Sequence, residues 1–220
     1  MYVDSDDEIE ISACEEIYKI VSKEDYDIIN FGTKVISNDK TKFISWALST
    51  NRFNINSEFL LNEVINQRIS HNIWNKVFHR RIIDKLIENI SDIQIMNSED
   101  MLQCLIAFYF AKSYKVIQKP LYIYYADIGV SNKNTNEIDT NKYDYLCKSS
   151  KIALDEFYNF LVKVKSNIAY GFLFSKIYYN QYNYLFEKIK NNNEEYIKII
   201  EKYFDKSIIN QYLHLQKYNE

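Results

Sequence analysis

Glycine and proline are scarce in this chain, which has three glycines and one proline among 220 residues. Sandwiches and barrels need many turn residues, so this shortage disfavours an all-β architecture. It predicts helices joined by polar turns instead. A chain of this length can bury a full core and needs no more than one or two domains.

Cysteine is also rare and shows no metal-binding pattern. Cys14, Cys104 and Cys147 are far apart, and the chain has no CxxC pair. The three histidines show no zinc-ligand spacing. These features predict reduced, mostly buried thiols in a cytoplasmic protein.

The chain has neither an excess of positive charge nor a long apolar run. Its formal net charge is −3, which provides no basic field for nucleic acid. No signal peptide is recognisable, and no apolar stretch is long enough to cross a bilayer. We therefore expect a protein that does not bind nucleic acid and that is soluble or peripheral to a membrane.

The patterns that are present change character near residue 130. Residues 1–130 mix strand-like and helical periodicity, whereas residues 131–220 are helical apart from a polar entry loop, so the sequence predicts an α-rich α/β protein with a helical C-terminal portion. The expected elements are a strand tail at 2–3, a helix at 9–23, a strand at 26–36 followed by a turn at 38–40, a helix capped by Asn56 and Ser57, a helix at 80–87, a helix capped by Asn97 and Ser98, two short strands around Pro120 within 114–125, a loop at 126–139, and helices from Thr140 onward.

Three aspartates near the start of the chain suggest a metal site. Asp4, Asp6 and Asp7 follow the apolar pair Tyr2 and Val3. Carboxylates at the end of a strand can hold a hard divalent cation, because oxygen ligands suit Mg²⁺ and Mn²⁺. The alternative is a solvated acidic turn that caps the following helix, where the helix dipole favours negative charge. The residues alone leave both interpretations open.

A second acidic pair has the same two interpretations. Glu99 and Asp100 follow Asn97 and Ser98 at the predicted start of a helix. The helix dipole stabilises carboxylates in a first turn, so capping explains them. A carboxylate at a helix start that faces a cleft can also act as a general base toward an attacking hydroxyl.

Four segments occur in a recognisable order. They are VDSDDEI, WNKVFHRRII, NSEDMLQ and KPLYIYYADIGVSN. The series resembles the C-terminal half of family 2 glycosyltransferases with the GT-A fold, the bacterial type that builds surface polysaccharides. The matching positions, which cover roughly residues 1–131, are Asp4 to Asp7 (the DxD motif), Trp74 to Lys76 with Arg80 and Arg81, Glu99 and Asp100, and Lys119 to Tyr125 with Ser131.

The resemblance implies a metal-dependent site for a nucleotide-sugar donor. Asp4 would lie near the donor ribose or diphosphate, Asp6 with Asp4 would bind Mn²⁺ or Mg²⁺, and Asp7 would support them. Lys76 would approach the diphosphate or the acceptor. The alternative for Lys76 is a solvated lysine that follows a core tryptophan.

The resemblance also implies an inverting displacement on a glycan or lipid-linked saccharide acceptor of the cell surface. Asp100 would be the base that takes the acceptor proton, with Glu99 beside it as the less favoured candidate. Arg80 and Arg81 are expected on a helix surface. Tyr122 and Tyr124 should share one face of a strand because side chains alternate along it.

Members of the family carry a Rossmann-like half before the DxD motif, whereas only Met1, Tyr2 and Val3 precede it here. We therefore expect a partial GT-A fold, either because Met1 lies inside a longer coding region or because this is a truncated product. On this basis the 220 residues alone are expected to show little sugar transfer. The alternative function is an inactive remnant that acts as an interaction module.

The C-terminal helices leave a third possibility open. Residues 161–190 mix lysines with many aromatic residues, a composition that suits the surface of a bilayer. A helix packed on its own domain with a solvated lysine face shows the same composition. The sequence therefore predicts a cytoplasmic protein, with peripheral contact at the inner face of the cell membrane as an open alternative.

Overall fold

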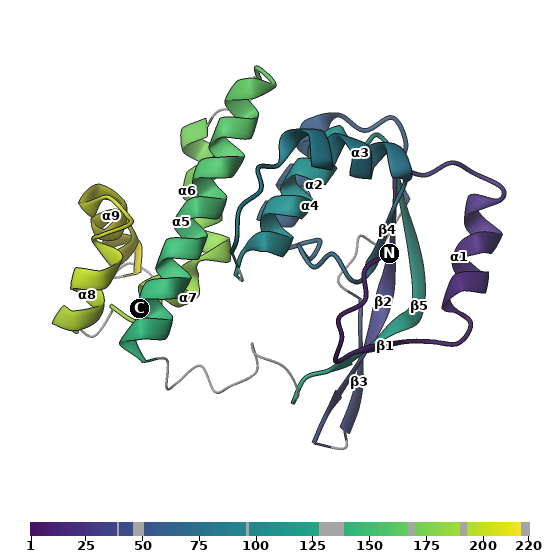
Figure 1. Cartoon of the computed structure of the whole chain (residues 1–220), viewed down its shortest axis with the longest axis horizontal. Coiled ribbons are helices and arrows are strands. Elements are labelled where there is room, and N and C mark those ends of the chain that lie inside the picture. Colours follow the sequence, from purple (N-terminus) through teal and green to yellow (C-terminus); the bar gives the residue numbers. More distant parts are fainter. Residues whose placement is uncertain are drawn as a thin grey trace. The chain divides into compact units, whose positions relative to one another are not determined.

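The computed structural model describes residues 1–38, 40–45, 51–95, 97–127, 139–166, 170–189 and 193–216. Its elements are β1 (Glu8–Ile9), α1 (Ala13–Val21), β2 (Ile28–Ser37), β3 (Lys40–Ile44), α2 (Ser57–Ile65), β4 (Lys76–Phe78), α3 (Arg80–Asn89), α4 (Glu99–Phe110), β5 (Tyr114–Tyr125), α5 (Thr140–Lys163), α6 (Tyr170–Gln181), α7 (Asn183–Glu187), α8 (Glu194–Ile200) and α9 (Lys206–Gln216) (Figure 1). The predicted α-rich α/β class is confirmed.

The chain forms two compact units. The sheet unit contains Met1–Ile90 and Gln103–Lys133, and the helical unit contains Ser91–Leu102 and Asn134–Glu220. The sequence predicted a single division near residue 130. The segment that carries the first turn of α4 belongs to the helical unit, so the division is not a single cut.

The sheet unit is built around β2 and β5, which run parallel to each other (Figure 1). β1 pairs with the other edge of β5, while β3 and β4 pair with opposite ends of β2, all antiparallel. β2 is rich in β-branched and apolar residues, and its first half is buried, as expected for a central strand. The predicted strand at 26–36 is confirmed.

Two predicted strand segments differ in the structure. Residues 2–3 form no strand; the strand follows the aspartates instead, as β1. Residues 114–125 form one strand rather than two, because β5 keeps its pairing with β2 across a register shift opposite Gly32. An ideal Cβ at Gly32 would lie 2.5 Å from the ring of Phe43, so the glycine leaves room for that ring.

The predicted helix starts are largely confirmed. Asn56 caps α2, where its side chain accepts a hydrogen bond from the backbone N–H of Phe59. Helix α1 begins at Ala13 rather than near residue 9, because Glu8 and Ile9 are used in β1. The core between α1 and the sheet consists of Ala13, Ile17, Tyr26, Ile29, Phe31, Trp74, Ile117, Leu121 and Tyr122.

The helical unit is organised by the long helix α5. The side chain of Asp139 caps α5 by accepting a hydrogen bond from the N–H of Lys142. The buried face of α5 carries tyrosine, cysteine, leucine and phenylalanine side chains. The hydroxyl of Tyr143 donates to the carbonyl of Leu185 at 2.9 Å, which joins α5 to α7. Among the described residues, no helix is long and apolar enough to span a membrane.

Candidate functional site

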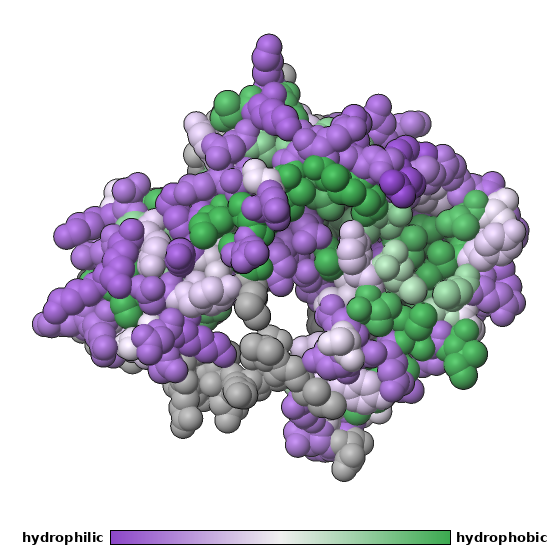
Figure 2. All heavy atoms as spheres, viewed as in Figure 1, coloured by the Kyte–Doolittle hydropathy of each residue, from purple (hydrophilic) through white to green (hydrophobic). Residues whose placement is uncertain are grey.

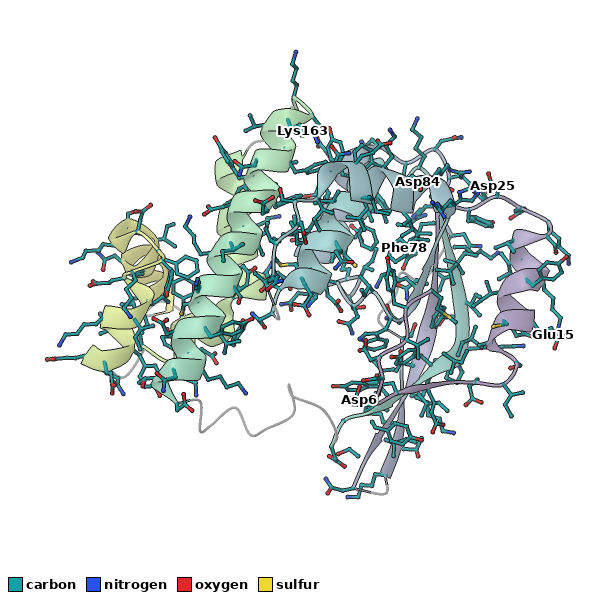
Figure 3. All side chains as sticks on the ribbon, in the orientation of Figure 1. Asp6, Glu15, Asp25, Phe78, Asp84 and Lys163 are labelled. Carbon is teal, nitrogen blue, oxygen red and sulfur yellow. The ribbon has the colours of Figure 1, made fainter. Side chains whose placement is uncertain are left out.

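Residues 4–7 form a turn directly before β1, and we call it the aspartate turn. The backbone N–H of Asp7 donates to the carbonyl of Asp4 at 3.2 Å, which closes the turn. Figure 3 shows Asp6 on this turn, beside β1. The capping alternative is wrong for these residues, because Ser12 precedes α1 and the aspartates lie next to a strand.

The hydroxyl of Tyr122 in β5 fastens the aspartate turn to the sheet. It accepts a hydrogen bond from the N–H of Asp4 at 3.1 Å and donates one to Oδ2 of Asp7 at 2.9 Å. The N–H of Tyr125 donates to Oδ1 of the same carboxylate at 3.0 Å. Burial raises the pKa of the Tyr122 hydroxyl, so it stays protonated and remains a donor. Asp7 therefore holds the aspartate turn against β5. Its supporting role at a donor site stays a prediction.

Trp74 holds the ring of Tyr122 in place. The two rings stack with centroids 4.6 Å apart, and the ring of Tyr124 stacks on the same tryptophan at 5.5 Å. The prediction that Tyr122 and Tyr124 share one face is thereby confirmed. Two segments that are distant in sequence, WNKVF and KPLYIYY, therefore meet beside the aspartate turn. They do so through the stacking of Trp74 on Tyr122 and the hydrogen bonds of the Tyr122 hydroxyl.

We expect Tyr122→Phe to lower the free energy of unfolding of the sheet unit by about 1–3 kcal/mol, because it leaves Oδ2 of Asp7 and the N–H of Asp4 without their shared partner. Urea denaturation measures the loss. The matched control is Tyr124→Phe, which keeps both bonds of Tyr122. An equal loss in both variants would show that the hydroxyl of Tyr122 has no special role.

The charges of the aspartate turn favour a cation. Partial burial, followed by the charges of Asp7 and Asp6, raises the pKa of Asp4. Burial also raises the pKa of Asp7, although its hydrogen bonds to Tyr125 and Tyr122 oppose the rise. The negative charge of Asp6 thus disfavours the ionised form of both Asp4 and Asp7, and a bound divalent cation would relieve this repulsion.

Only part of the aspartate turn offers carboxylate oxygens that could bind Mg²⁺ or Mn²⁺. Asp4 and Asp6 are exposed, whereas Asp7 is half-buried and bonded to β5. Within the described ranges, no group of three or more histidine, cysteine, aspartate or glutamate side chains could hold a metal ion. Mg²⁺ is commonly held by one or two carboxylates together with substrate phosphates. A cation here would therefore use Asp4 and Asp6 and would complete its shell with other oxygens.

Lys76 does not point to solvent. Its side chain is completely buried, and Nζ donates to the carbonyl of Asn72 at 2.6 Å, Oδ1 of Asn75 at 2.7 Å and Oγ of Ser70 at 3.3 Å. The alternative of a solvated lysine is therefore wrong. An ammonium has three hydrogens, and these three acceptors use them. The contact with a diphosphate remains a prediction, and it would require the loop 70–75 to rearrange.

Sequence reasoning missed Asp27, a carboxylate of the sheet unit that accepts several hydrogen bonds. Its side chain is buried, and Oδ1 accepts from Nε of Arg81 at 2.6 Å. Oδ2 accepts from the N–H groups of Lys112 and Ser113 at 2.7 and 3.1 Å. An aspartate directly before the apolar run of β2 was the available signal. The surface position predicted for Arg80 is confirmed, since it pairs with the exposed Asp84.

Glu99 and Asp100 begin α4, in the part of that helix that belongs to the helical unit. Both are half-buried. Oε2 of Glu99 is buried and has no hydrogen-bond partner among the described residues. Ser98 precedes them with a φ of 70°, which is not the extended conformation usual for an N-cap. Ser131 and most of the predicted loop 126–139 lie outside the described residues.

Comparisons with known proteins bear on the fold. No family model and no curated protein matches the sequence. Among solved structures, the fold is similar to that of TarS 1–349 from S. aureus, a glycosyltransferase, with a TM-score of 0.53 and 12% sequence identity. The match covers 91% of this chain and 55% of that one, so the chain spans about half the length of TarS 1–349. The chain therefore has a glycosyltransferase-like fold.

Proposed function

We propose that this chain is a family 2 glycosyltransferase, or part of one, that transfers a sugar from a nucleotide-sugar donor to a glycan or lipid-linked saccharide acceptor with inversion. The observation that carries this proposal is the link between the aspartate turn and β5. The hydroxyl of Tyr122 joins the VDSDDEI and KPLYIYY segments, and it does so within a glycosyltransferase-like fold.

In this proposal the donor diphosphate binds at the aspartate turn. Asp4 and Asp6 would hold Mn²⁺ or Mg²⁺, which when bound supplies positive charge to the departing nucleoside diphosphate. Asp7 keeps the turn attached to β5 through Tyr122 and Tyr125. Asp100 accepts the proton of the acceptor hydroxyl as that oxygen attacks the anomeric carbon. Glu99 is the second candidate for this proton transfer.

Calorimetry with uridine diphosphate and inorganic pyrophosphate, each with and without Mn²⁺, tests the donor site. We expect Mn²⁺ to strengthen diphosphate binding, and Asp6→Asn to weaken the Mn²⁺-dependent binding by at least about tenfold. The control is Asp84→Asn, an exposed aspartate of α3 that pairs with Arg80 (Figure 3). Diphosphate binding that ignores Mn²⁺ and Asp6 would refute the proposed metal site.

The alternative of an interaction module is favoured by apolar exposure on the sheet unit. Several large apolar side chains of this unit are exposed: Val3, Ile11, Val21, Phe43 and Phe53. Figure 2 shows hydrophobic residues on the face of the sheet unit that it draws. Exposed apolar surface of this kind often marks a contact site. A chain that binds no diphosphate under any metal condition would support this alternative. Peripheral membrane contact by the helical unit stays a prediction, and co-sedimentation with anionic liposomes tests it.

A further inference from the structure

The backbone directly before Glu99 and Asp100 is strained. Ser98 has a φ of 70°, in the left-handed region that side-chain-bearing residues rarely adopt. Its carbonyl accepts the N–H of Leu102 at 3.0 Å, so the strained residue also starts the hydrogen bonding of α4. A change of φ at Ser98 would therefore change the direction of the first turn, which carries both carboxylates.

A polar network in the helical unit surrounds Ser98. Nδ2 of Asn97 lies 3.1 Å from Oγ of Ser98, 3.0 Å from the hydroxyl of Tyr184 and 3.4 Å from Oγ of Ser150. The hydroxyls of Ser98 and Ser150 are also 3.4 Å apart. Ser150 lies on α5 and is completely buried, while Tyr184 lies on α7 and is 37% exposed.

This network reaches Ser98 from two helices of the C-terminal portion. Strained backbone persists only where the surroundings hold it, and it is concentrated at functional sites. Here the surroundings are the hydroxyls of Ser150 and Tyr184, which fix the amide of Asn97 and the side chain of Ser98. The neighbouring Oε2 of Glu99 is buried without a partner among the described residues, so the turn presents an acidic oxygen whose hydrogen-bonding capacity is unused.

We propose that Asn97, Ser150 and Tyr184 are positioning residues that hold Ser98 in its left-handed conformation and thereby aim the Glu99–Asp100 turn at the acceptor. This inference rests on the proposed function. It gives α5 and α7 an indirect role in catalysis, because the hydroxyls of Ser150 and Tyr184 would determine the position of the base. Ser150 and Tyr184 touch neither substrate nor the reacting atoms in this proposal.

The first test measures the turn itself and needs no activity. We expect Ser150→Ala and Tyr184→Phe each to speed hydrogen exchange of the Leu102 N–H by about tenfold or more, because the bond to the Ser98 carbonyl opens more often. The matched control is Ser149→Ala, which removes a neighbouring buried hydroxyl of α5 that is not part of the network. Thermal unfolding identifies any variant that fails to fold, and the exposed position of Tyr184 makes its variant the safer one.

The second test uses glycine as a rescue. Glycine adopts positive φ without strain, so Ser98→Gly should make the turn less dependent on the network. We expect Ser150→Ala to lower kcat about tenfold or more, with the donor KM changed by less than about threefold, because the base is misplaced after binding. In the Ser98→Gly background, the same substitution should have a clearly smaller effect on both exchange and kcat.

The outcomes separate the two proposals. If Ser150→Ala behaves like Ser149→Ala in both exchange and kcat, the positioning role is overturned. Faster exchange with an unchanged kcat overturns it as well, since the network is then only structural. If the unmodified protein transfers no sugar, sugar transfer by this chain alone is refuted and the positioning role in catalysis falls with it, while the exchange measurement still decides whether the network holds the turn.

Discussion

Asp100→Asn is expected to reduce sugar transfer by about 10²–10⁴-fold, because an amide cannot take the proton that the acceptor hydroxyl must lose. The substitution keeps the size of the side chain and its place in the first turn of α4. The assay is best run as a single turnover with protein in excess over the nucleotide-sugar donor, because product release then does not mask the transfer step.

Two comparisons make this prediction specific. Mn²⁺-dependent binding of uridine diphosphate should be unchanged in Asp100→Asn, because the substitution leaves Asp4, Asp6 and the bonds from Tyr122 and Tyr125 to the aspartate turn in place. Glu99→Gln should have the smaller effect of the two substitutions. A larger loss in Glu99→Gln would transfer the role of base to Glu99. Transfer that survives both substitutions would refute a base on this turn.

Asp27→Ala is expected to lower the free energy of unfolding of the sheet unit by about 3–5 kcal/mol. The loss comes mainly from two backbone N–H groups that lose their acceptor, at about 1–3 kcal/mol each, and in smaller part from an ion pair whose arginine is 45% exposed. The carboxylate joins three parts of the unit. It accepts from Arg81 at the start of α3, and from the backbone of Lys112 and Ser113 before β5. Its removal leaves two backbone N–H groups and one guanidinium without that acceptor.

Urea denaturation followed by tryptophan fluorescence measures this loss, since Trp74 lies in the core of the sheet unit. The matched control is Asp84→Ala in α3. Asp84 pairs with Arg80, which is 81% exposed, so its removal should cost no more than about 1 kcal/mol. Similar losses in the two variants would show that the contacts of Asp27 contribute no more than a surface ion pair.

Local features of the fold could be predicted because neighbouring residues determine them. The cap at Asn56 depends on an oxygen three residues before an N–H, which is a property of the sequence. The helical periodicity of α5 is likewise local. The prediction of a strand at residues 2–3 was wrong. A strand needs a second strand to pair with, and the residues of a segment do not encode which strand that will be.

The candidate site likewise combines features that the local sequence determines with features that depend on contacts between distant segments. The order of VDSDDEI, NSEDMLQ and KPLYIYY indicated which carboxylates are candidates for the site. The bond from Tyr122 to Asp7, however, joins residues 115 positions apart, and it exists only because β1 pairs with β5. No local pattern distinguishes this tyrosine from the other tyrosines of the strand.

The sequence by itself determined the α/β class, the helical C-terminal portion and the identity of the acidic residues, because propensities, caps and motif order are written along the chain. The tertiary structure alone decided what those residues can reach. It buried Lys76 among three acceptors and fixed Asp7 to β5. It also brought the hydroxyl of Ser98 to 3.4 Å from the hydroxyl of Ser150 on α5. Burial and hydrogen-bond partners depend on contacts between distant segments, and those contacts form only when the chain packs.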